Sequence, residues 1–362
     1  MLESVISRFD VPGKLVRSGR FGSGLINDTY LCEFNGGGPV RKYILQRINV
    51  SVFRHPDQVM RNVEIVTAHI QDRLRKKGVD DPWSVTPGLV RTISGRSFHR
   101  DEDGGFWRMF HFIETGVVFD AVQGPDHACE VGRGLGMFQE LVSDLPPGKL
   151  HDTLPGFHHT PVSLRELDEA VKKDSAGRAA EAKEEVRFAD RRRALAPLLI
   201  DEMKLGRVPV RVVHNDPKVN NVLVHRETGK AVCMVDLDTV KPGIVLFDYG
   251  DCVRSAANPA GEDAEDLGKV RLDPALAAAI TRGYLREAGA FLTPKEIELL
   301  PVSVKVITYE LGLRFLTDHL RGDTYFKIAY PGHNLRRARV QFRLLESIEE
   351  QEGRLSEAFR VT

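Results

Sequence analysis

A short segment in the second half of the sequence holds the residues best suited to chemistry. Asp216 follows an apolar run, Asn221 comes five residues later, and Asp236 ends the next apolar run. In phosphoryl transfer a carboxylate orients and deprotonates the attacking hydroxyl, while asparagine and carboxylate oxygens bind magnesium. The spacing therefore predicts a catalytic loop with Asp216 as its base, followed by a metal loop, with Asn221 and Asp236 as the metal ligands.

Two neighbours of Asp216 are expected to support it. Lys218 is a second catalytic candidate, because its ammonium group could steady either the transferred phosphate or the Asp216 carboxylate. His214 is expected to brace the loop, since the aspartate already accepts the proton. A single aspartate or asparagine in a turn is usually a capping residue. The combination, followed by a turn and a second apolar strand, favours catalysis.

The start of the chain is predicted to form a small sheet that covers a nucleotide. Strands are expected at residues 17–20, 29–34 and 41–48. Gly22 and Gly24 lie between the first two strands, where their backbone amides could approach phosphates closely. The third glycine of the usual kinase loop is absent, and an ordinary hairpin turn would show the same pair.

An amphipathic helix is predicted from residue 57 to about residue 77. Glu64 on this helix is the candidate partner for a cation that contacts the nucleotide phosphates. Kinases commonly place a lysine for this purpose on the third strand, but this sequence has Gln46 and Arg47 there. The two side chains point to opposite faces, so only one can serve, and Gln46 is taken as the nucleotide-binding residue. A simple surface pair between Glu64 and Arg47 stays open.

Residues 106–116 form an apolar run that ends in a turn. The resemblance described below implies that this segment is the hinge between two lobes, with backbone groups near Phe112 and Glu114 binding the adenine edge. A plain buried edge strand would have the same sequence pattern. Helical patterns follow at residues 126–145 and 164–205.

Composition indicates a cytoplasmic protein whose partners are small molecules. The 362 residues carry a formal net charge of zero, so no global charge favours nucleic acid or a membrane surface. The four cysteines form no Cys-x-x-Cys pair and are expected to be reduced thiols. Neither a secretory signal nor a membrane span is recognised.

The motif His-x-Asp-x-x-x-x-Asn followed by a strand-borne aspartate resembles the aminoglycoside phosphotransferase and choline kinase family. More closely, the chain resembles the N-acetylhexosamine 1-kinases within that family. The matching strings are residues 26–30, 43–46, 60–64, 235–239, 246–251 and 314–316. The resemblance implies an α+β, bilobal protein-kinase-like fold that uses ATP and Mg²⁺. Residues 1–113 would form a small N-terminal sheet lobe that binds nucleotide, and residues 114–362 a larger, mainly helical lobe for catalysis and substrate.

The same resemblance implies the sugar-binding residues. Thr239, Arg314 and Tyr325 match positions that contact the sugar in those kinases, beside Asp216, which meets the reacting hydroxyl. Because Glu310 and Arg314 lie one helical turn apart, an ion pair between them is an alternative fate. Leu25 stands where the resembling kinases have a histidine that touches substrate, which could mean a different sugar.

The expected function is ATP-dependent phosphorylation of a small sugar, at the anomeric hydroxyl of N-acetylglucosamine or N-acetylgalactosamine. Two alternatives remain open. One is a kinase of the same fold that acts on an aminoglycoside, another hexose or a choline-like amine. The other is an inactive nucleotide-binding protein, since the usual strand lysine is missing.

Overall fold

The described part of the chain, residues 2–22 and 26–353 of the computed structural model, begins with a six-stranded antiparallel sheet. Its strands are β1 (Lys14–Arg20), β2 (Asp28–Asn35), β3 (Arg41–Ile48), β4 (Leu89–Val90), β5 (His99–Arg100) and β6 (Phe106–His111). They lie in the order β1-β2-β3-β6-β4, and β5 pairs with β6. The three strands predicted from the sequence are confirmed, with ends within three residues of those expected.

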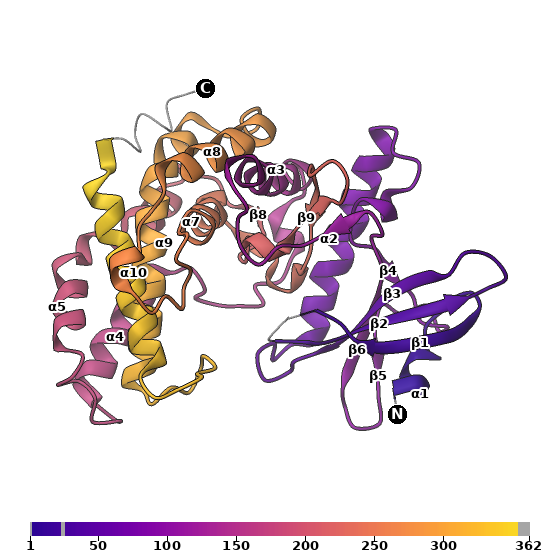
Figure 1. Cartoon of the computed structure of the whole chain (residues 1–362), viewed down its shortest axis with the longest axis horizontal. Coiled ribbons are helices and arrows are strands. Elements are labelled where there is room, and N and C mark those ends of the chain that lie inside the picture. Colours follow the sequence, from indigo (N-terminus) through magenta and orange to yellow (C-terminus); the bar gives the residue numbers. More distant parts are fainter. Residues whose placement is uncertain (1, 23–25, 354–362) are drawn as a thin grey trace.

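Helix α2 (Pro56–Lys76) lies between the sheet and the rest of the molecule (Figure 1). This confirms the predicted amphipathic helix, whose buried stripe is Val59, Met60, Val63, Val66 and Ile70. Pro56 suits the first turn, where its missing N–H is not needed. Asn62 is buried and links α2 to the large region, the mainly helical part of the chain that follows β6. Its Nδ2 donates to the carbonyls of His151 and Val240 at 2.9 and 3.0 Å, and its Oδ1 accepts from the His151 N–H at 2.8 Å.

Alternation along β6 gives the sheet two different faces. Trp107 and Met109 pack in a cluster with α1 (Leu2–Ile6) on one face. Phe106 and Phe110 pack on the other face against the core that includes α2, and Arg108 lies between them. The face toward α2 is therefore the one that carries a charged side chain.

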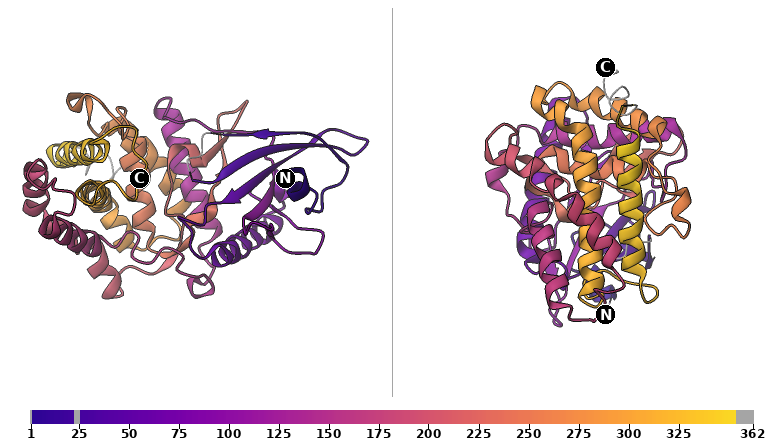
Figure 2. Two further views of the ribbon diagram at one scale, coloured as in Figure 1. Left: turned by 90° about the horizontal axis from the view of Figure 1, so that it is seen from below. Right: turned by 90° about the vertical axis from the view of Figure 1, so that its left-hand side faces the viewer.

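The rest of the chain is mainly helical and lies at the opposite end of an elongated molecule (Figure 2). Its helices are α3 (Pro125–Leu141), α4 (Thr160–Lys173), α5 (Lys183–Arg191), α6 (Leu198–Lys204), α7 (Val245–Ala256), α8 (Pro274–Ala288), α9 (Pro294–Leu320) and α10 (His333–Glu350). Short strands β7 (Gly116–Val117), β9 (Val222–His225) and β10 (Ala231–Met234) form one sheet, and β8 (Arg211–Val213) pairs with β11 (Lys241–Gly243). The 3₁₀ turns are η1 (Pro82–Ser84), η2 (Pro147–Lys149), η3 (Arg193–Leu195), η4 (Val219–Asn221), η5 (Leu237–Thr239) and η6 (Leu267–Lys269).

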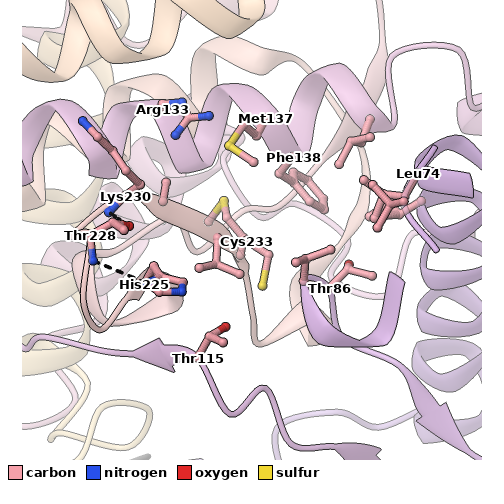
Figure 3. A pocket seen from close by; sticks show the side chains of 17 residues that line it. Leu74, Thr86, Thr115, Arg133, Met137, Phe138, His225, Thr228, Lys230 and Cys233 are labelled. Carbon is pink, nitrogen blue, oxygen red and sulfur yellow. Dashed lines mark hydrogen bonds between the residues drawn. The ribbon is translucent and has the colours of Figure 1, made fainter. Parts of the chain in front are cut away.

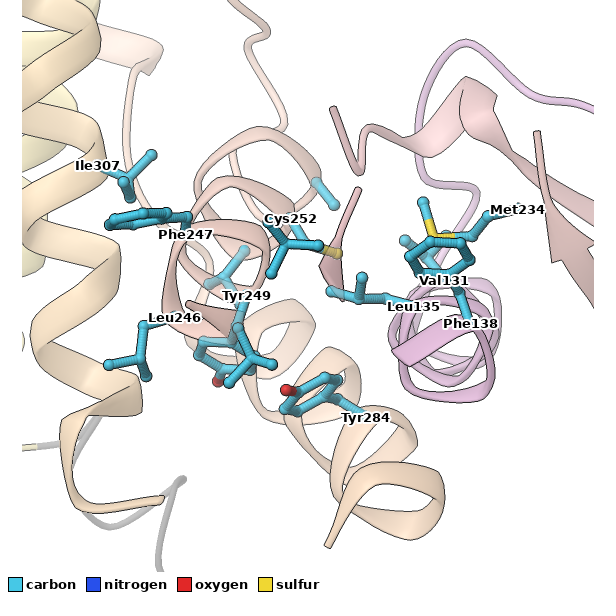
Figure 4. Close-up of a cluster of buried hydrophobic side chains, with 14 of the residues drawn as sticks. Val131, Leu135, Phe138, Met234, Leu246, Phe247, Tyr249, Cys252, Tyr284 and Ile307 are labelled. Atoms are coloured by element: carbon cyan, nitrogen blue, oxygen red, sulfur yellow. The ribbon is translucent and has the colours of Figure 1, made fainter. Parts of the chain in front are cut away.

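A continuous apolar core runs from α2 through α3 and α7 to α9. Figure 4 shows its middle, where Tyr249 of α7 and Tyr284 of α8 face each other with ring centroids 5.0 Å apart. Helices α3 and α8 approach closely because glycines face the opposing backbone. A Cβ on Gly132 would come within 2.0 Å of the Ile280 carbonyl oxygen, so no larger residue fits. This close packing of α3 against α8 supports the loops that carry Asp216 and Asp236.

The predicted helical pattern at residues 164–205 is wrong as a continuous element. The structure breaks it into α4, α5, η3 and α6. Asp174 adopts a left-handed conformation with φ of 40° at the end of α4, and Gly177 follows with φ of 67°. Apolar periodicity continued past these residues because α4, α5 and η3 bury faces in one cluster, whereas Leu199 and Ile200 of α6 pack in the main core.

Two further sequence expectations concern the whole molecule. The four cysteines are free thiols. Within residues 2–22 and 26–353, none of the helices combines the length and the apolar character needed to cross a bilayer.

Candidate active site

The loop between β8 and β9 brings three of the predicted residues together. The Asp216 carboxylate Oδ2 lies 2.8 Å from Lys218 Nζ and accepts from Asn221 Nδ2 at 3.0 Å. Asn221 Nδ2 also donates to the Asp216 carbonyl at 2.8 Å, so its Oδ1 is turned away from Asp216. Loss of hydration would lower the pKa of Lys218, but the neighbouring Asp216 outweighs it and the pKa is raised. Lys218 is therefore a cation beside the proposed base.

The second predicted loop adjoins the first through the backbone. The Val235 N–H donates to the Asn221 carbonyl at 2.9 Å, which places Asp236 beside Asn221. Asp236 has φ of 63°, an unfavourable backbone conformation for a residue with a side chain. Although its side chain reaches solvent, loss of hydration raises the pKa of Asp236 to about 7, with further contributions from Asp238 and Asp216. The site therefore concentrates negative charge that a cation would relieve.

The buried carboxylate of Asp248 holds the loop that carries Asp216. Its carboxylate accepts from the backbone N–H groups of His214 and Asn215 at 2.8 and 2.6 Å, and from Gln139 Nε2 at 2.9 Å. Tyr284 in turn donates to Gln139 at 2.6 Å. Burial raises the pKa of Asp248. Because Asn215 has φ of 66°, the two N–H groups point the same way, toward one carboxylate.

We expect Asp248→Asn to lower the free energy of unfolding by about 2–4 kcal/mol, because the amide offers one acceptor to two backbone N–H groups. The kcat should fall as well, since the loop that positions Asp216 loses its anchor. Urea denaturation and steady-state kinetics would measure both effects. Asp120→Asn, at an exposed position, is the matched control. Unchanged stability would show that the loop does not depend on this carboxylate.

His214 and Thr239 brace the catalytic loop. His214 is fully buried, which lowers its pKa, and its Nε2 lies 3.0 Å from the Val235 carbonyl. Its Nδ1 accepts from the Asp216 N–H at 3.3 Å, so Nε2 carries the proton. Thr239 Oγ1 donates to the His214 carbonyl at 2.6 Å. The Thr239 hydroxyl, which was predicted to bind sugar, thus donates a hydrogen bond to the backbone of the loop that carries Asp216.

The predicted nucleotide-binding residues of the sheet and α2, Gln46 and Glu64, have different partners. Gln46 accepts from Arg108 Nε at 3.0 Å and donates to Thr29 at 3.2 Å. Glu64 forms an ion pair with Arg91 and lies 3.7 Å from Arg61. The structure therefore does not bring Glu64 to Gln46.

The predicted hinge connects β6 to β7. The Phe112 N–H donates to the Lys42 carbonyl at 3.2 Å, and Lys42 Nζ lies 3.0 Å from Glu114 Oε2. Phe21, from the end of β1, meets the Phe112 ring edge-on at 5.8 Å. Gly22 adopts φ of 77°, as a tight turn requires. Of the other predictions in this turn, Gly24 and Leu25 lie outside the described residues.

Arg314 of α9 and Tyr325, in the loop after α9, meet in an aromatic cluster. The Arg314 guanidinium lies 4.7 Å from the Phe157 ring centroid, 5.4 Å from Phe326 and 5.8 Å from Tyr325. Tyr325 is 63% exposed. The loop that carries it is fixed by Asp318, whose carboxylate accepts from the backbone N–H groups of 324, 325 and 326 at 2.9 Å.

Glu310 does not form the ion pair with Arg314 that was considered as an alternative. Its carboxylate accepts from Thr160 Oγ1 at 2.5 Å and lies 3.3 Å from His158 Nδ1. Burial would raise the pKa of Glu310, but the contacts with His158 and Thr160 and the charge of Arg314 lower it. Among the described contacts, Arg314 has no carboxylate within ion-pair distance.

Sequence reasoning missed Arg108, Asn62 and Asp318. Arg108 ion-pairs with Asp238, and both side chains are almost completely buried. A signal for it existed, because Arg108 is a charged residue inside the apolar string Phe-Trp-Arg-Met-Phe. The partners of Asn62 are backbone groups far along the chain, which the sequence does not mark. Asp318 binds backbone groups only six to eight residues away, in a loop whose conformation no sequence pattern specifies.

A cavity of about 500 Å³ lies between α2, α3 and the β9–β10 hairpin (Figure 3). Its lining includes Leu74, Phe138 and Met234, with Arg133 and Lys230 also among the lining residues. None of the predicted site residues lines it. The cavity therefore lies apart from the residues predicted to react, and hydrogen bonds and charges define the arrangement of those residues.

The oxygen atoms available beside Asp216 suit magnesium. Among the described residues, no group of three His, Cys, Asp or Glu side chains could hold a metal by itself. Magnesium in phosphate-transfer sites is typically bound by one or two carboxylates, with phosphates and waters completing six positions. Asn221 Oδ1 and Asp236 fit that role, and the pKa of Asp236 is raised by burial first and then by the charges of Asp238 and Asp216.

Comparison with known families gives a match over most of the chain. The sequence profile described as the phosphotransferase enzyme family matches residues 19–294. This range includes the sheet, α2 and both loops around Asp216 and Asp236. Arg314 and Tyr325 lie beyond its end.

Solved structures with a similar fold include three kinases of small molecules. An aminoglycoside phosphotransferase from Alicyclobacillus acidocaldarius has a TM-score of 0.61 at 16% identity, covering 96% of this chain and 95% of that one. A spectinomycin phosphotransferase, in complex with ADP and spectinomycin, has a TM-score of 0.56 at 11% identity, covering 93% and 94%. A choline kinase from Cryptosporidium parvum has a TM-score of 0.55 at 12% identity, covering 95% and 91%. The predicted fold, a small sheet region with a larger helical region, is confirmed.

Proposed function

Because this chain belongs to the phosphotransferase enzyme family, we propose that it transfers a phosphoryl group from ATP to the anomeric hydroxyl of N-acetylglucosamine or N-acetylgalactosamine. The chain is a phosphotransferase with a hydroxyl group as acceptor. The observation that carries the proposed chemistry is the Asp216 carboxylate, held by Lys218 and Asn221 next to Asp236. The choice of sugar rests on the resemblance of the motif strings and on the surroundings of Arg314.

In the proposed reaction Asp216 orients the sugar hydroxyl and accepts its proton. The hydroxyl oxygen forms a bond to the γ-phosphorus, and the bond from that phosphorus to the bridging oxygen of ADP breaks. Lys218 steadies the carboxylate before transfer and can bind the negative phosphate oxygens during it. Asn221 keeps Asp216 in one orientation, which is the main contribution that protein groups make to this reaction. Magnesium held by Asn221 and Asp236 would neutralise charge on the phosphates.

We propose the same division of labour between the two parts of the chain that the sequence suggested. Residues 1–113 would bind the nucleotide beneath the sheet, with Phe112 and Glu114 at the adenine edge and Gln46 on the phosphate side. Residues 114–362 would hold the acceptor and the reacting groups. All six strands of the sheet lie before residue 113, and β7 already pairs with β9, which supports a boundary at this point.

We expect kcat/KM for MgATP to fall as the pH drops below about 7, by up to about tenfold per pH unit. The ionised form of Asp236 is the metal ligand, and its pKa is raised to about 7, so protonation below that pH removes the ligand. A pH profile from 5 to 9 would measure this. At saturating MgATP the bound cation favours the carboxylate, so kcat should persist to lower pH. A kcat/KM that stays constant down to pH 5 would contradict this role of Asp236.

The acceptor side favours a neutral or anionic substrate. Arg314 presents a guanidinium without a carboxylate partner among the described residues, and the exposed Tyr325 hydroxyl lies nearby. A planar donor and a phenol can satisfy sugar hydroxyls or an amide carbonyl, and a site built for such bonds discriminates against analogues that lack them. A cationic aminoglycoside or choline-like amine would be repelled by Arg314.

The test is ATP consumption with magnesium across free hexoses, N-acetylhexosamines, aminoglycosides and choline, followed by phosphorus NMR of the product. An anomeric phosphate on an N-acetylhexosamine supports the proposal, and Arg314→Met should then raise the KM for sugar far more than the KM for ATP. Turnover only on an aminoglycoside or on choline would refute the sugar assignment and leave the phosphotransfer residues in place.

A further inference from the structure

On the sheet face toward α2, the buried cation Arg108 comes from β6, whereas β3 contributes the neutral side chain of Gln46. Gln46 of β3 stands directly opposite Arg108 of β6 in the antiparallel register. Arg108 Nε donates to Gln46 Oε1 at 3.0 Å, and Gln46 Nε2 donates to Thr29 Oγ1 at 3.2 Å. The amide at this β3 position therefore aligns the neighbouring guanidinium and carries no charge of its own.

Arg108 is buried where an unpaired charge would be very unfavourable. Its side chain is 1% exposed, and its ion-pair partner Asp238 is 2% exposed. The guanidinium also lies 5.1 Å from the Phe110 ring centroid and 3.9 Å from Met60 Sδ. A buried ion pair is tolerated only when its geometry is good and its remaining donors are satisfied, so these two charges depend on each other.

Helix α2 supplies no acid to this cation. In many kinases a helix glutamate pairs with the strand lysine and aligns it with the phosphates. Here Met60 is the α2 residue in contact with Arg108, whereas Glu64 pairs with Arg91. The counterion comes instead from η5, in the large region.

Asp238 connects that pair to the loop of Asp236. It lies two residues after Asp236, within the same turn. Its second oxygen accepts from Asn27 Nδ2 at 2.7 Å, and Asn27 Oδ1 accepts from the Asn49 N–H at 3.0 Å. One carboxylate of the large region is thus bound from β6 and from the turn that precedes β2.

We propose that Arg108 is the positioning residue of the Asp236 loop, and that its ion pair with Asp238, aligned by Gln46, replaces the lysine–glutamate pair of other kinases. Arg108 acts through Asp238 and does not touch the substrate. It sets where Asp236 lies relative to the sheet that covers the nucleotide. The proposal rests on the role in phosphoryl transfer proposed above for Asp236.

The first test compares Arg108→Met and Arg108→Lys with the matched control Arg100→Met. Arg100 of β5 is exposed, and its guanidinium lies 5.4 Å from the ring centroid of Phe106, on the same strand β6 as Arg108. We expect Arg108→Met to lower kcat by about 10²-fold through misplacement of the loop and to raise the KM for MgATP, with little change in the KM of the acceptor. Arg108→Lys should recover part of the loss, and Arg100→Met should behave as wild type. Wild-type kinetics for Arg108→Met would overturn the proposal.

A second measurement separates positioning from folding and does not require a known acceptor. Calorimetry would compare ATP binding with magnesium and with EDTA. The metal-dependent gain in affinity should be lost in Arg108→Met and kept in Asp216→Asn. If Arg108→Met does not fold, the double variant Arg108→Met, Asp238→Asn removes both charges and should fold, yet still lack the gain. If the metal-dependent gain in ATP affinity persists in Arg108→Met or in the double variant, the proposal is overturned. Absence of sugar turnover in the wild-type protein refutes only the proposed substrate.

Discussion

Asp216→Asn should reduce kcat by about 10²–10⁴-fold while the KM for MgATP stays near its wild-type value. The amide keeps the size of the carboxylate and can still accept from Asn221 Nδ2, so the loop should retain its shape. It cannot accept the hydroxyl proton, and it no longer pairs with Lys218. The loss therefore falls on the chemical step and not on nucleotide binding.

The comparison for Asp216→Asn is Asp201→Asn, which changes an exposed carboxylate on α6. Steady-state kinetics with saturating acceptor and calorimetric ATP binding would be measured on both variants. Full activity in Asp216→Asn would remove this residue from the mechanism. Loss of ATP binding together with kcat would mean that Asp216 acts in loop structure and not as a base.

Asp236→Asn is expected to lower kcat/KM for MgATP by roughly 10²–10³-fold, which corresponds to about 3–4 kcal/mol of lost charge stabilisation. The same change should raise the thermal midpoint of the ligand-free protein at pH 8. The folded pKa of Asp236, about 7, lies above the value for an unfolded chain, so the folded state binds the extra proton between about pH 4 and 7. Stability contributed by the protonated group is therefore lost as the pH rises through 7, and the amide avoids that loss.

Thermal melts at pH 5 and pH 8 would check the stability side of this expectation. The difference between Asp236→Asn and wild type should be small at pH 5 and larger at pH 8. A variant that is less active and more stable would be the signature of a residue kept for function. Lower stability at both values of pH would show that the ionised carboxylate supports the fold, contrary to the charge arrangement seen here.

The sequence predicted elements and spacing better than contacts across the fold. The strands, α2 and the loop around Asp216 follow from local periodicity and turn residues, and the structure places Asp216, Lys218 and Asn221 together as expected. The break after Asp174 was missed because a left-handed residue can end a helix without glycine or proline. Glu64 of α2 was predicted to pair with a cation on the third strand, but it forms an ion pair with Arg91.

What was missed depends on register and on the approach of distant segments. Gln46 was recognised as an unusual residue, but its partner Arg108 follows only from the alignment of β3 with β6. The role of Asp238 required the large region to be placed against the sheet, which no local pattern specifies. Thr239 was predicted from resemblance to bind sugar, and this stays a prediction: its hydroxyl donates to the His214 carbonyl and keeps its acceptor positions.

The three hydrogen bonds of Asn62 have a consequence for motion and control. They tie α2 to the backbone of residues 151 and 240, so the helix moves with the large region although it packs against the sheet. We therefore expect any opening for nucleotide exchange to move the strands relative to α2. In kinases that are switched on and off, displacement of the corresponding helix breaks the active arrangement. The three Asn62 bonds would oppose such a displacement of α2 in this chain.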